Sequence, residues 1–294
     1  MTSRNARLAF ASACLLLLAG LVQTGCTSLR SRHETYTQLA RASAWHTYLV
    51  ATSSFDIAAA APQRQVGAGP LVVYLEGDGR AYLNPYYVSP DPTPISPLAL
   101  RLAVADGLGG PKVYLARPCQ YTMPSHGRNC EPELWTTARY SASIIGAISE
   151  AIDQAKHNTR SEQVLIVGYS GGGALAVILA AQRRDVVAIV TVAANLDLAY
   201  WTQRDGLAKL DGSLDPADFA NAVSGIPQLH FAGAKDDVVG PDVVSAFLAR
   251  MAHSASSRLV TLGDYDHECC WADAWPQLLR HQEAQKVLDR VFPP

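Results

Sequence analysis

The sequence predicts an α/β fold with a mostly parallel central sheet and helices on both faces. Short apolar runs alternate along the chain with longer segments that have helical periodicity. The runs are apolar at most consecutive positions rather than at every second position, which is typical of parallel strands buried on both faces. A length of 294 residues with 49% hydrophobic side chains is sufficient for one large domain with a full core, predicted over residues 51–294.

Six apolar runs are predicted as the strands of this sheet. Glycine or proline bounds most of them, and both residues interrupt regular structure. A further stretch around Phe55–Ala58 is expected to add an edge strand. The six runs are Leu71–Leu75, Lys112–Ala116, Val164–Val167, Val186–Ala193, Gln228–Ala232 and Arg258–Leu262.

Five segments between or after these runs are predicted as helices. The first is expected to begin with Ser96 as its N-cap and Pro97 as its first residue. Residues 200–225 contain Asp-Gly and Asp-Pro turns and are predicted to form a cap-like excursion over the sheet edge. The helices are expected over 97–106, 135–157, 172–183, 242–253 and 271–291.

The first 25 residues are predicted to be an export signal. Arg4 and Arg7 precede an apolar stretch, Leu8–Val22, whose length of about 15 residues is short of the about 20 that span a bilayer. Residues 26–50 are then expected to be an N-terminal tether, because their first part is rich in Ser, Thr and Arg.

The end of the signal predicts a lipid anchor. Thr24-Gly25-Cys26 looks like the end of a bacterial lipobox, in which Cys26 is lipidated and becomes the new N-terminus. This predicts a protein on the periplasmic side of the envelope, with the membrane as its partner through the anchor. Gln23 stands where an apolar residue is usual, so a plain signal peptide cut near Gly25 is the alternative.

The charge balance argues against nucleic acid as a partner. The 24 Lys and Arg residues nearly match the 26 Asp and Glu residues, giving a net charge of −2. No basic run is present that could neutralise a phosphate backbone.

Cysteine usage agrees with export. Of the six cysteines, the four that follow Cys26 suggest disulfides in an oxidising compartment. Cys119–Cys130 is the favoured pair, since it would close a short loop rich in Pro, Gly and Ser. Cys269 and Cys270 are expected to be free or joined to each other, with a zinc site beside His267 as a weaker alternative.

The pentapeptide Gly168-Tyr169-Ser170-Gly171-Gly172 matches G-x-S-x-G between a predicted strand and a predicted helix. A sharp turn there would lift the Ser170 hydroxyl above the sheet edge and aim the Gly171 N–H at developing negative charge. A phosphate-binding turn is the competing interpretation, but neither the P-loop nor the dinucleotide pattern is present. The motif therefore predicts a nucleophilic serine.

A serine nucleophile needs a base, and the base needs an orienting acid. Asp236 follows the strand Gln228–Ala232, and His267 follows the next strand. Both lie beyond the carboxyl ends of parallel strands, at the same edge as Ser170. Asp237 is the alternative acid, while His230 lies inside a predicted strand and is expected to be a core residue.

A second oxyanion donor is expected in the loop after Leu71–Leu75. By position the donor is the N–H of Asp78, with Gly79 as the alternative, and a simple tight turn is the other interpretation. The acidic side chains of Glu76 and Asp78 are expected to point away or to bind Arg80 or loop N–H groups.

In chain order, these motifs resemble those of the α/β-hydrolase superfamily: Gly168-x-Ser170-x-Gly172, Gly233-x-x-Asp236 and His267. The resemblance covers about residues 55–290 and implies the α/β-hydrolase fold. Three stretches also look like an uncharacterised bacterial group of exported α/β-hydrolases, for which no substrate is implied. They are Val73–Gly79, Ala116–Tyr121 and Asp266–Trp271.

The sequence thus predicts an exported serine hydrolase that acts on a small acyl substrate, with a carboxylic ester as the first substrate class. Ser170, His267 and Asp236 would act together, and the chemistry requires no metal or cofactor. A peptidase or amidase is the alternative among enzymes. A non-catalytic envelope protein that binds through the same scaffold is the alternative outside them.

Overall fold

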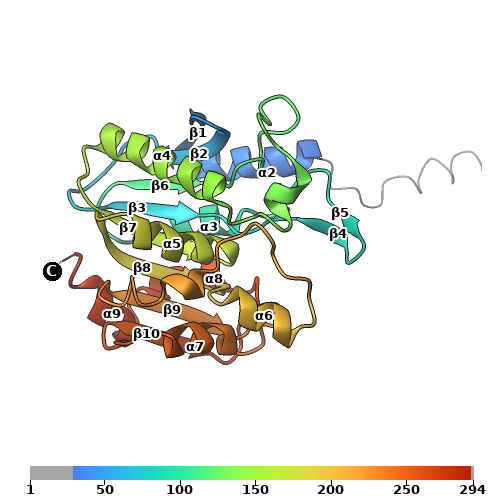
Figure 1. Ribbon diagram of the computed structural model, residues 1–294. Helices are drawn as coiled ribbons and strands as arrows, with labels where there is room; N and C mark the ends of the chain where they lie inside the picture. The colour runs from blue at the N-terminus through green and yellow to red at the C-terminus, as the bar shows by residue number, and fades with distance from the viewer. Residues whose placement is uncertain (1–28, 293–294) are drawn as a thin grey trace, which may run out of the picture.

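An eight-stranded sheet forms the centre of the computed structural model, which describes residues 29–292 (Figure 1). Its strand order is β1-β2-β6-β3-β7-β8-β9-β10. The six strands from β6 to β10 are parallel, whereas β1 and β2 run antiparallel at one edge. The strands are β1 (Trp45–Ala51), β2 (Asp56–Pro62), β3 (Leu71–Leu75), β6 (Lys112–Leu115), β7 (Val164–Tyr169), β8 (Val186–Val192), β9 (Gln228–Gly233) and β10 (Ser257–Leu262).

Helices cover both faces of this sheet, as predicted (Figure 1). On one face the strands pack against α4 (Ala142–Thr159), α5 (Gly171–Gln182) and α7 (Pro241–Ala249). On the other face they pack against α2 (Leu29–Ala42), α3 (Leu98–Ala105), α8 (Trp271–Leu278) and α9 (Gln282–Leu288). Continuous apolar strands supply side chains to both cores, which explains why the runs do not alternate.

The predicted tether over 26–50 is wrong for the part that the structure describes. Residues 29–42 form α2, and the next segment forms β1, which pairs along its whole length with β2. Tyr36 and Ala40 lie one helical turn apart and are buried in the core, as is Trp45. This apolar stripe is narrow and lies among polar residues, so composition alone concealed it. The expected edge strand near Phe55 is β2, but β1 lies outside it.

Several helix boundaries also differ from the predictions. The segment expected to begin at Trp135 starts as a 3₁₀ turn, Pro132–Trp135, and α4 begins only at Ala142. The expected C-terminal helix is divided into α8 and α9. Pro97, rather than Ser96, occupies the N-cap of α3 and gives no side-chain cap.

Two smaller features lie at the carboxyl end of the sheet. A hairpin of β4 (Tyr82–Asn84) and β5 (Tyr87–Val88) projects beyond β3 and pairs only with itself. The predicted excursion over 200–225 contains the end of α6 (Leu198–Arg204) and a 3₁₀ turn, Pro216–Phe219.

The structure joins Cys119 to Cys130, the favoured pair. Cys269 is joined to Cys270, which was one of the two expectations for them. The signal and Cys26 lie outside the described residues. Within residues 29–292, no helix has both the length and the apolar character needed to cross a membrane.

Candidate active site

Ser170 occupies a tight turn between β7 and α5. Its backbone angles are φ 51° and ψ −120°, a conformation that non-glycine residues rarely adopt. The turn is held from both sides, because the Ser170 N–H donates to the Val192 carbonyl at 2.9 Å and the Ser170 carbonyl accepts from Gly173 N–H at 2.9 Å. The side chain is thereby presented at the carboxyl edge of the sheet.

The glycines that flank Ser170 are required by close packing. A Cβ atom on Gly168 would lie 2.3 Å from the carbonyl oxygen of Gly172. A Cβ atom on Gly172 would lie 2.3 Å from the carbonyl oxygen of Leu75. Both neighbours are backbone atoms that cannot rotate away, so the spacing of the motif follows from sterics.

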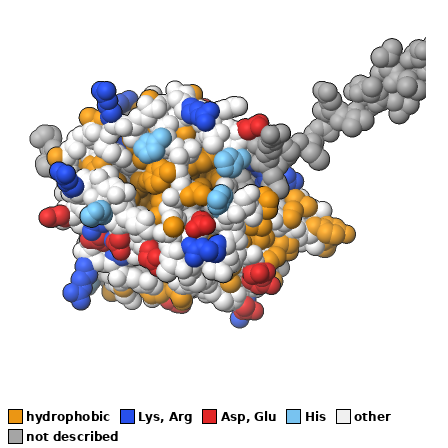
Figure 2. Space-filling view, turned by 90° about the horizontal axis from the view of Figure 1, so that it is seen from above, with side chains coloured by type: hydrophobic (Ala, Val, Ile, Leu, Met, Phe, Trp, Pro, Cys, Tyr) orange, Lys and Arg blue, Asp and Glu red, His pale blue; other side chains and the backbone are white. Residues whose placement is uncertain are grey.

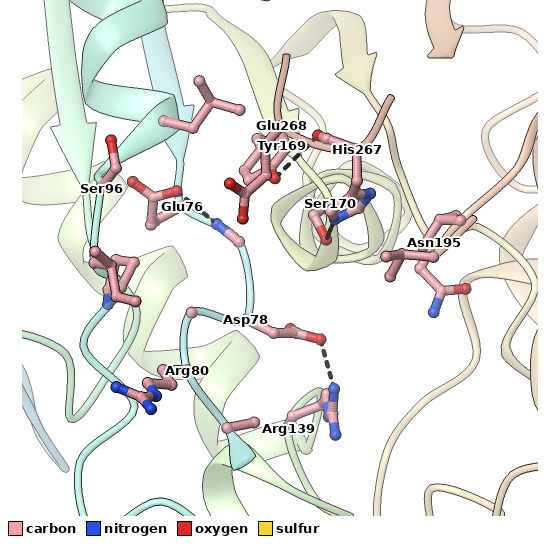
Figure 3. A pocket seen from close by; sticks show the side chains of 18 of the residues that line it. Glu76, Asp78, Arg80, Ser96, Arg139, Tyr169, Ser170, Asn195, His267 and Glu268 are labelled. Carbon is pink, nitrogen blue, oxygen red and sulfur yellow. Dashed lines mark hydrogen bonds and ion pairs between the residues drawn. The ribbon is translucent and has the colours of Figure 1, made fainter. Parts of the chain in front are cut away.

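His267 lies between Ser170 and Asp236. Its Nε2 is 3.1 Å from Ser170 Oγ (Figure 3). Its Nδ1 is 2.9 Å from Asp236 Oδ2. The loop that carries the imidazole is fixed, because Tyr169 Oη and Trp271 Nε1 each donate to the His267 carbonyl at 3.2 Å. The structure therefore brings three side chains from distant loops into one hydrogen-bonded chain.

The acid in this chain is Asp236 and not its alternative Asp237. The Asp236 side chain has no exposed surface, and its Oδ1 accepts from the backbone N–H groups of Val238 and Val239 at 2.9 and 2.7 Å. These bonds orient the other oxygen toward the imidazole. Asp237 is exposed to solvent.

The predicted oxyanion donors lie beside Ser170. Among the described residues, no partner accepts a hydrogen bond from the backbone N–H of Asp78 or Gly171. The loop between β3 and Arg80 is close to α5, since a Cβ atom on Gly171 would lie 2.0 Å from Asp78 Oδ1. Two backbone N–H groups without an acceptor among the described residues therefore lie on two segments that pack against each other next to Ser170.

The side chain of Asp78 is bound differently from the expectation. It does not pair with Arg80 but with Arg117 and Arg139, the latter at 2.6 Å, and it accepts from Tyr140 Oη at 2.9 Å. Burial opposes ionisation of Asp78, yet the two arginines outweigh it and hold the pKa of the carboxyl below its ordinary value. Two buried guanidinium groups therefore face one carboxylate, which leaves an excess positive charge near Ser170.

Glu76 is buried directly beneath the same loop. Its Oε1 accepts from Gly77 N–H at 3.0 Å and from Ala99 N–H at 3.3 Å, and its Oε2 accepts from Tyr114 Oη at 3.0 Å. The expectation that this carboxyl binds loop N–H groups is confirmed. Burial raises the pKa of Glu76 to about 7 despite these hydrogen bonds.

A pocket opens above Ser170 and His267 (Figure 3). Its walls come from the loop after β3, the hairpin, the start of α3, α6 and the loop after β10. The wall includes two residues that belong to no recognised sequence motif, Arg139 and the buried Asn195. Asn195 comes three residues after β8, so its position beyond a strand end was a signal that could have identified it.

The remaining polar candidates lie apart from this chain of hydrogen bonds. His230 is fully buried, its Nδ1 is 2.8 Å from Thr191 Oγ1, and burial lowers its pKa to about 3. The zinc alternative relied on the thiolates of Cys269 and Cys270, whose sulfurs are bonded to each other. No group of three His, Cys, Asp or Glu side chains within residues 29–292 is arranged to hold a metal ion.

No protein-family model matches the sequence, and no curated protein matches it either. Solved structures do match the fold. The esterase Pf2001 of Pyrococcus furiosus superposes with a TM-score of 0.57 at 13% identity, over 84% of this chain and 94% of that one. A membrane phospholipase A, described as a bacterial virulence factor, gives 0.53 at 14% identity, over 98% and 100%.

The name of a third solved structure refers to the α/β-hydrolase fold. An α/β serine hydrolase homologue from Coxiella burnetii has a TM-score of 0.54 at 14% identity, over 82% of this chain and 97% of that chain. The solved structures match this chain in its fold, in which helical layers cover both faces of a mostly parallel sheet. The chain has the α/β-hydrolase fold.

Proposed function

We propose that the protein is a serine hydrolase that cleaves carboxylic esters. The observation that carries the proposal is the hydrogen-bonded chain from Ser170 Oγ through His267 to Asp236, with contacts of 3.1 and 2.9 Å. A nucleophile, a base and an orienting acid in that order are the requirements for acyl transfer through a serine.

In the proposed reaction, Ser170 Oγ attacks the acyl carbonyl while His267 Nε2 takes the hydroxyl proton. The negative charge on the carbonyl oxygen is held by the N–H groups of Asp78 and Gly171. Asp236 fixes the ring and offsets its positive charge. The imidazolium then gives the proton to the departing alkoxide, which leaves as an alcohol. Ser170 remains as an acyl ester. Water, deprotonated by the same imidazole, releases the acid and restores the serine.

An ester is the favoured substrate class for two reasons. An alkoxide leaves with less assistance from a general acid than an amide nitrogen does, so ester cleavage places the smallest catalytic demand on the site. The names of two structures that share the fold, an esterase and a phospholipase, also refer to enzymes that cleave esters.

The decisive experiment is labelling with a fluorophosphonate probe, which phosphonylates an activated serine. We expect the wild-type protein to be labelled and Ser170→Ala not to be, with the two proteins equally folded by circular dichroism. Ser141→Ala, at a serine on the surface N-terminal to α4, serves as the control and should keep full labelling. Absence of labelling in the folded wild type would favour the non-catalytic binder.

The substrate class is tested by parallel assays of p-nitrophenyl esters of increasing acyl length and of p-nitroanilide peptides. We expect turnover of esters that Ser170→Ala abolishes. Preference for the anilides by kcat/KM would instead identify a peptidase or amidase.

We also propose that the protein is exported and carries a lipid on Cys26. The support is the N-terminal sequence, together with a Cys119–Cys130 disulfide that suits an oxidising compartment. Metabolic labelling with a radioactive fatty acid in a bacterial host should mark the wild type and not Cys26→Ser. Labelling of neither protein, with both in the periplasmic fraction, would favour a plain signal peptide.

A further inference from the structure

The hairpin β4–β5 exposes apolar side chains to an unusual extent. Tyr86 is 90% exposed and Tyr87 is 66% exposed. No charged residue occurs between positions 81 and 90. More than half of the exposed large hydrophobic side chains in the described part of the chain belong to the set Tyr82, Leu83, Tyr86, Tyr87, Val88 and Ile95. We call these six residues the hairpin patch.

Nothing within the described chain covers the hairpin patch. The two strands pair with each other and not with the eight-stranded sheet. Figure 2 shows hydrophobic side chains gathered on a projection at the side of the molecule where Figure 1 places the hairpin. Contiguous exposed apolar surface of this kind marks a site of contact with a partner or a membrane.

The composition of the hairpin patch suits the surface of a bilayer. Three of its members are tyrosines, whose rings place an apolar body in the acyl region and a hydroxyl among the headgroups. The remaining members are aliphatic and would enter the same apolar layer. At the base of the hairpin, Arg80 makes no ion pair or side-chain hydrogen bond with any described residue, so its guanidinium can bind a lipid phosphate.

The start of α2 lies close to the hairpin. Arg32, in the first turns of α2, donates to the carbonyl of Thr93 and to that of Asp91 at 3.4 Å. It also lies 4.0 Å from the Asp91 carboxylate. The start of α2 is thus bonded to the loop that follows β5. Cys26 precedes α2 by three residues, which span at most about 10 Å.

We propose that the hairpin patch docks on the surface of a phospholipid bilayer. The sequence and the fold point to the same occupant, because Cys26, the proposed lipid site, is only three residues along the chain from the start of α2. Tyr82 and Ile95 belong to the patch and also line the pocket that contains Ser170. Docking therefore places the pocket mouth at the lipid surface.

A pocket mouth at the lipid surface implies a substrate class. A pocket that opens at a bilayer receives esters whose acyl chains are dissolved in that bilayer, such as acylglycerols or phospholipids. The substrate class rests on the proposed function, whereas the docking does not.

Docking is tested with a chain that begins at Thr27, which lacks the anchor but retains every strand and both cores, since these lie within residues 29–292. Ser170→Ala is included in all samples, so that catalysis plays no part. Cosedimentation is measured with vesicles of phosphatidylcholine and phosphatidylglycerol. We expect binding, which Tyr86→Ser weakens about tenfold through the loss of one buried aromatic side chain.

The matched control is Val66→Ser. Val66 is 76% exposed but precedes β3, at the opposite end of the strand from the hairpin. It should not change binding, and Tyr86→Trp should preserve it. Absence of binding by the folded chain, or equal loss in the control, would overturn the proposal. A dimer in sedimentation equilibrium that Tyr86→Ser dissociates would also overturn it, with a second copy as the occupant.

The substrate class has its own readout in the active Thr27 chain. Tyr86→Ser should lower hydrolysis of a fluorogenic phospholipid in vesicles about tenfold and leave hydrolysis of soluble p-nitrophenyl acetate unchanged. Loss of both activities would count against the docking explanation. Inactivity of the wild type on both esters, with vesicle binding intact, would refute the proposed function alone.

Discussion

At the scale of single residues, the adjacent aspartates after β9 provide a natural comparison. Asp236 and Asp237 have the same chemistry and neighbouring positions, but only Asp236 is buried against His267. The difference arises because two backbone N–H groups bind one oxygen of Asp236 and direct the other toward the imidazole. The end of β9 predicts where in the chain the acid lies. Only the geometry of the following turn decides between Asp236 and Asp237.

Replacement of these two aspartates should therefore give opposite results. Asp236→Asn should lower kcat on p-nitrophenyl acetate by about 10⁴-fold, since the amide cannot hold the ring in the required tautomer or offset its charge. Asp237→Asn should stay within about twofold of wild type, because its side chain contacts solvent. Equal activity of the two variants would remove Asp236 from the mechanism.

Arg139 should act as a positioning residue through Asp78. Arg139→Gln removes one of the two guanidinium groups that hold the Asp78 carboxylate, so the Asp78 N–H would be less firmly directed at the oxyanion. We expect kcat to fall about tenfold to a hundredfold with little change in KM. Arg139→Lys should recover part of the loss.

The control for Arg139 is Arg101→Gln, because Arg101 lines the same pocket but pairs with the exposed Asp273. It should leave kcat unchanged. A fall in melting temperature of Arg139→Gln without a change in kcat would show a purely structural role.

The sequence identified the members of the hydrogen-bonded chain Ser170–His267–Asp236 better than the residues around them. Ser170 and His267 carry recognisable spacing at strand ends, and their positions could be predicted. The pairing of Asp78 with Arg117 and Arg139 could not, because Arg139 is distant in sequence and lies in a loop with no repeating pattern. The sequence shows that the loop after β3 is acidic, but it does not show that arginines neutralise Asp78.

At the scale of elements, the buried strands were predictable and the N-terminal segment was not. Val164–Val167 and Leu71–Leu75 are apolar at every position, a pattern that surface structure cannot adopt. In α2 only a narrow stripe is apolar, and in β1 only Trp45 and Val50 are buried. The hairpin was also missed, because exposed strands of two or three residues leave almost no periodic signal.

The contribution of α2 to stability distinguishes an integral element from a tether. Tyr36 is 2% exposed, stacks on Tyr121 and donates to the Ala59 carbonyl at 2.6 Å. Tyr36→Ala should lower the free energy of unfolding by about 3–5 kcal/mol in urea denaturation. Gln38→Ala, on the exposed side of α2, should change it by less than about 0.5 kcal/mol. Equal stability of both variants would restore the tether interpretation.

At the scale of the whole molecule, Glu76 couples stability to pH. Its pKa in the folded protein is about 7, above the ordinary 4.5, so the folded state keeps a proton that the unfolded chain releases. The resulting stabilisation is fully present below pH 4.5 and is lost as the pH rises through 7. Over that window the contribution is up to about 3 kcal/mol.

Glu76→Gln should remove this dependence. Between pH 5 and 8 we expect the urea midpoint of the wild type to fall relative to that of the variant. Glu268→Gln, at an exposed carboxyl of the same pocket, should follow the wild type. Parallel profiles for Glu76→Gln and wild type would show that Glu76 is ionised throughout.

The glycines around Ser170 have a consequence for protein engineering. Gly168 and Gly172 abut main-chain atoms of β3 and α5, so a library randomised there would return almost exclusively inactive clones. Two pocket walls, supplied by Tyr82 of the hairpin and by Trp201 of α6, consist of side chains rather than of glycines packed against main-chain atoms. Directed evolution of the proposed ester hydrolysis toward new acyl groups should therefore leave the turn invariant and diversify those two walls.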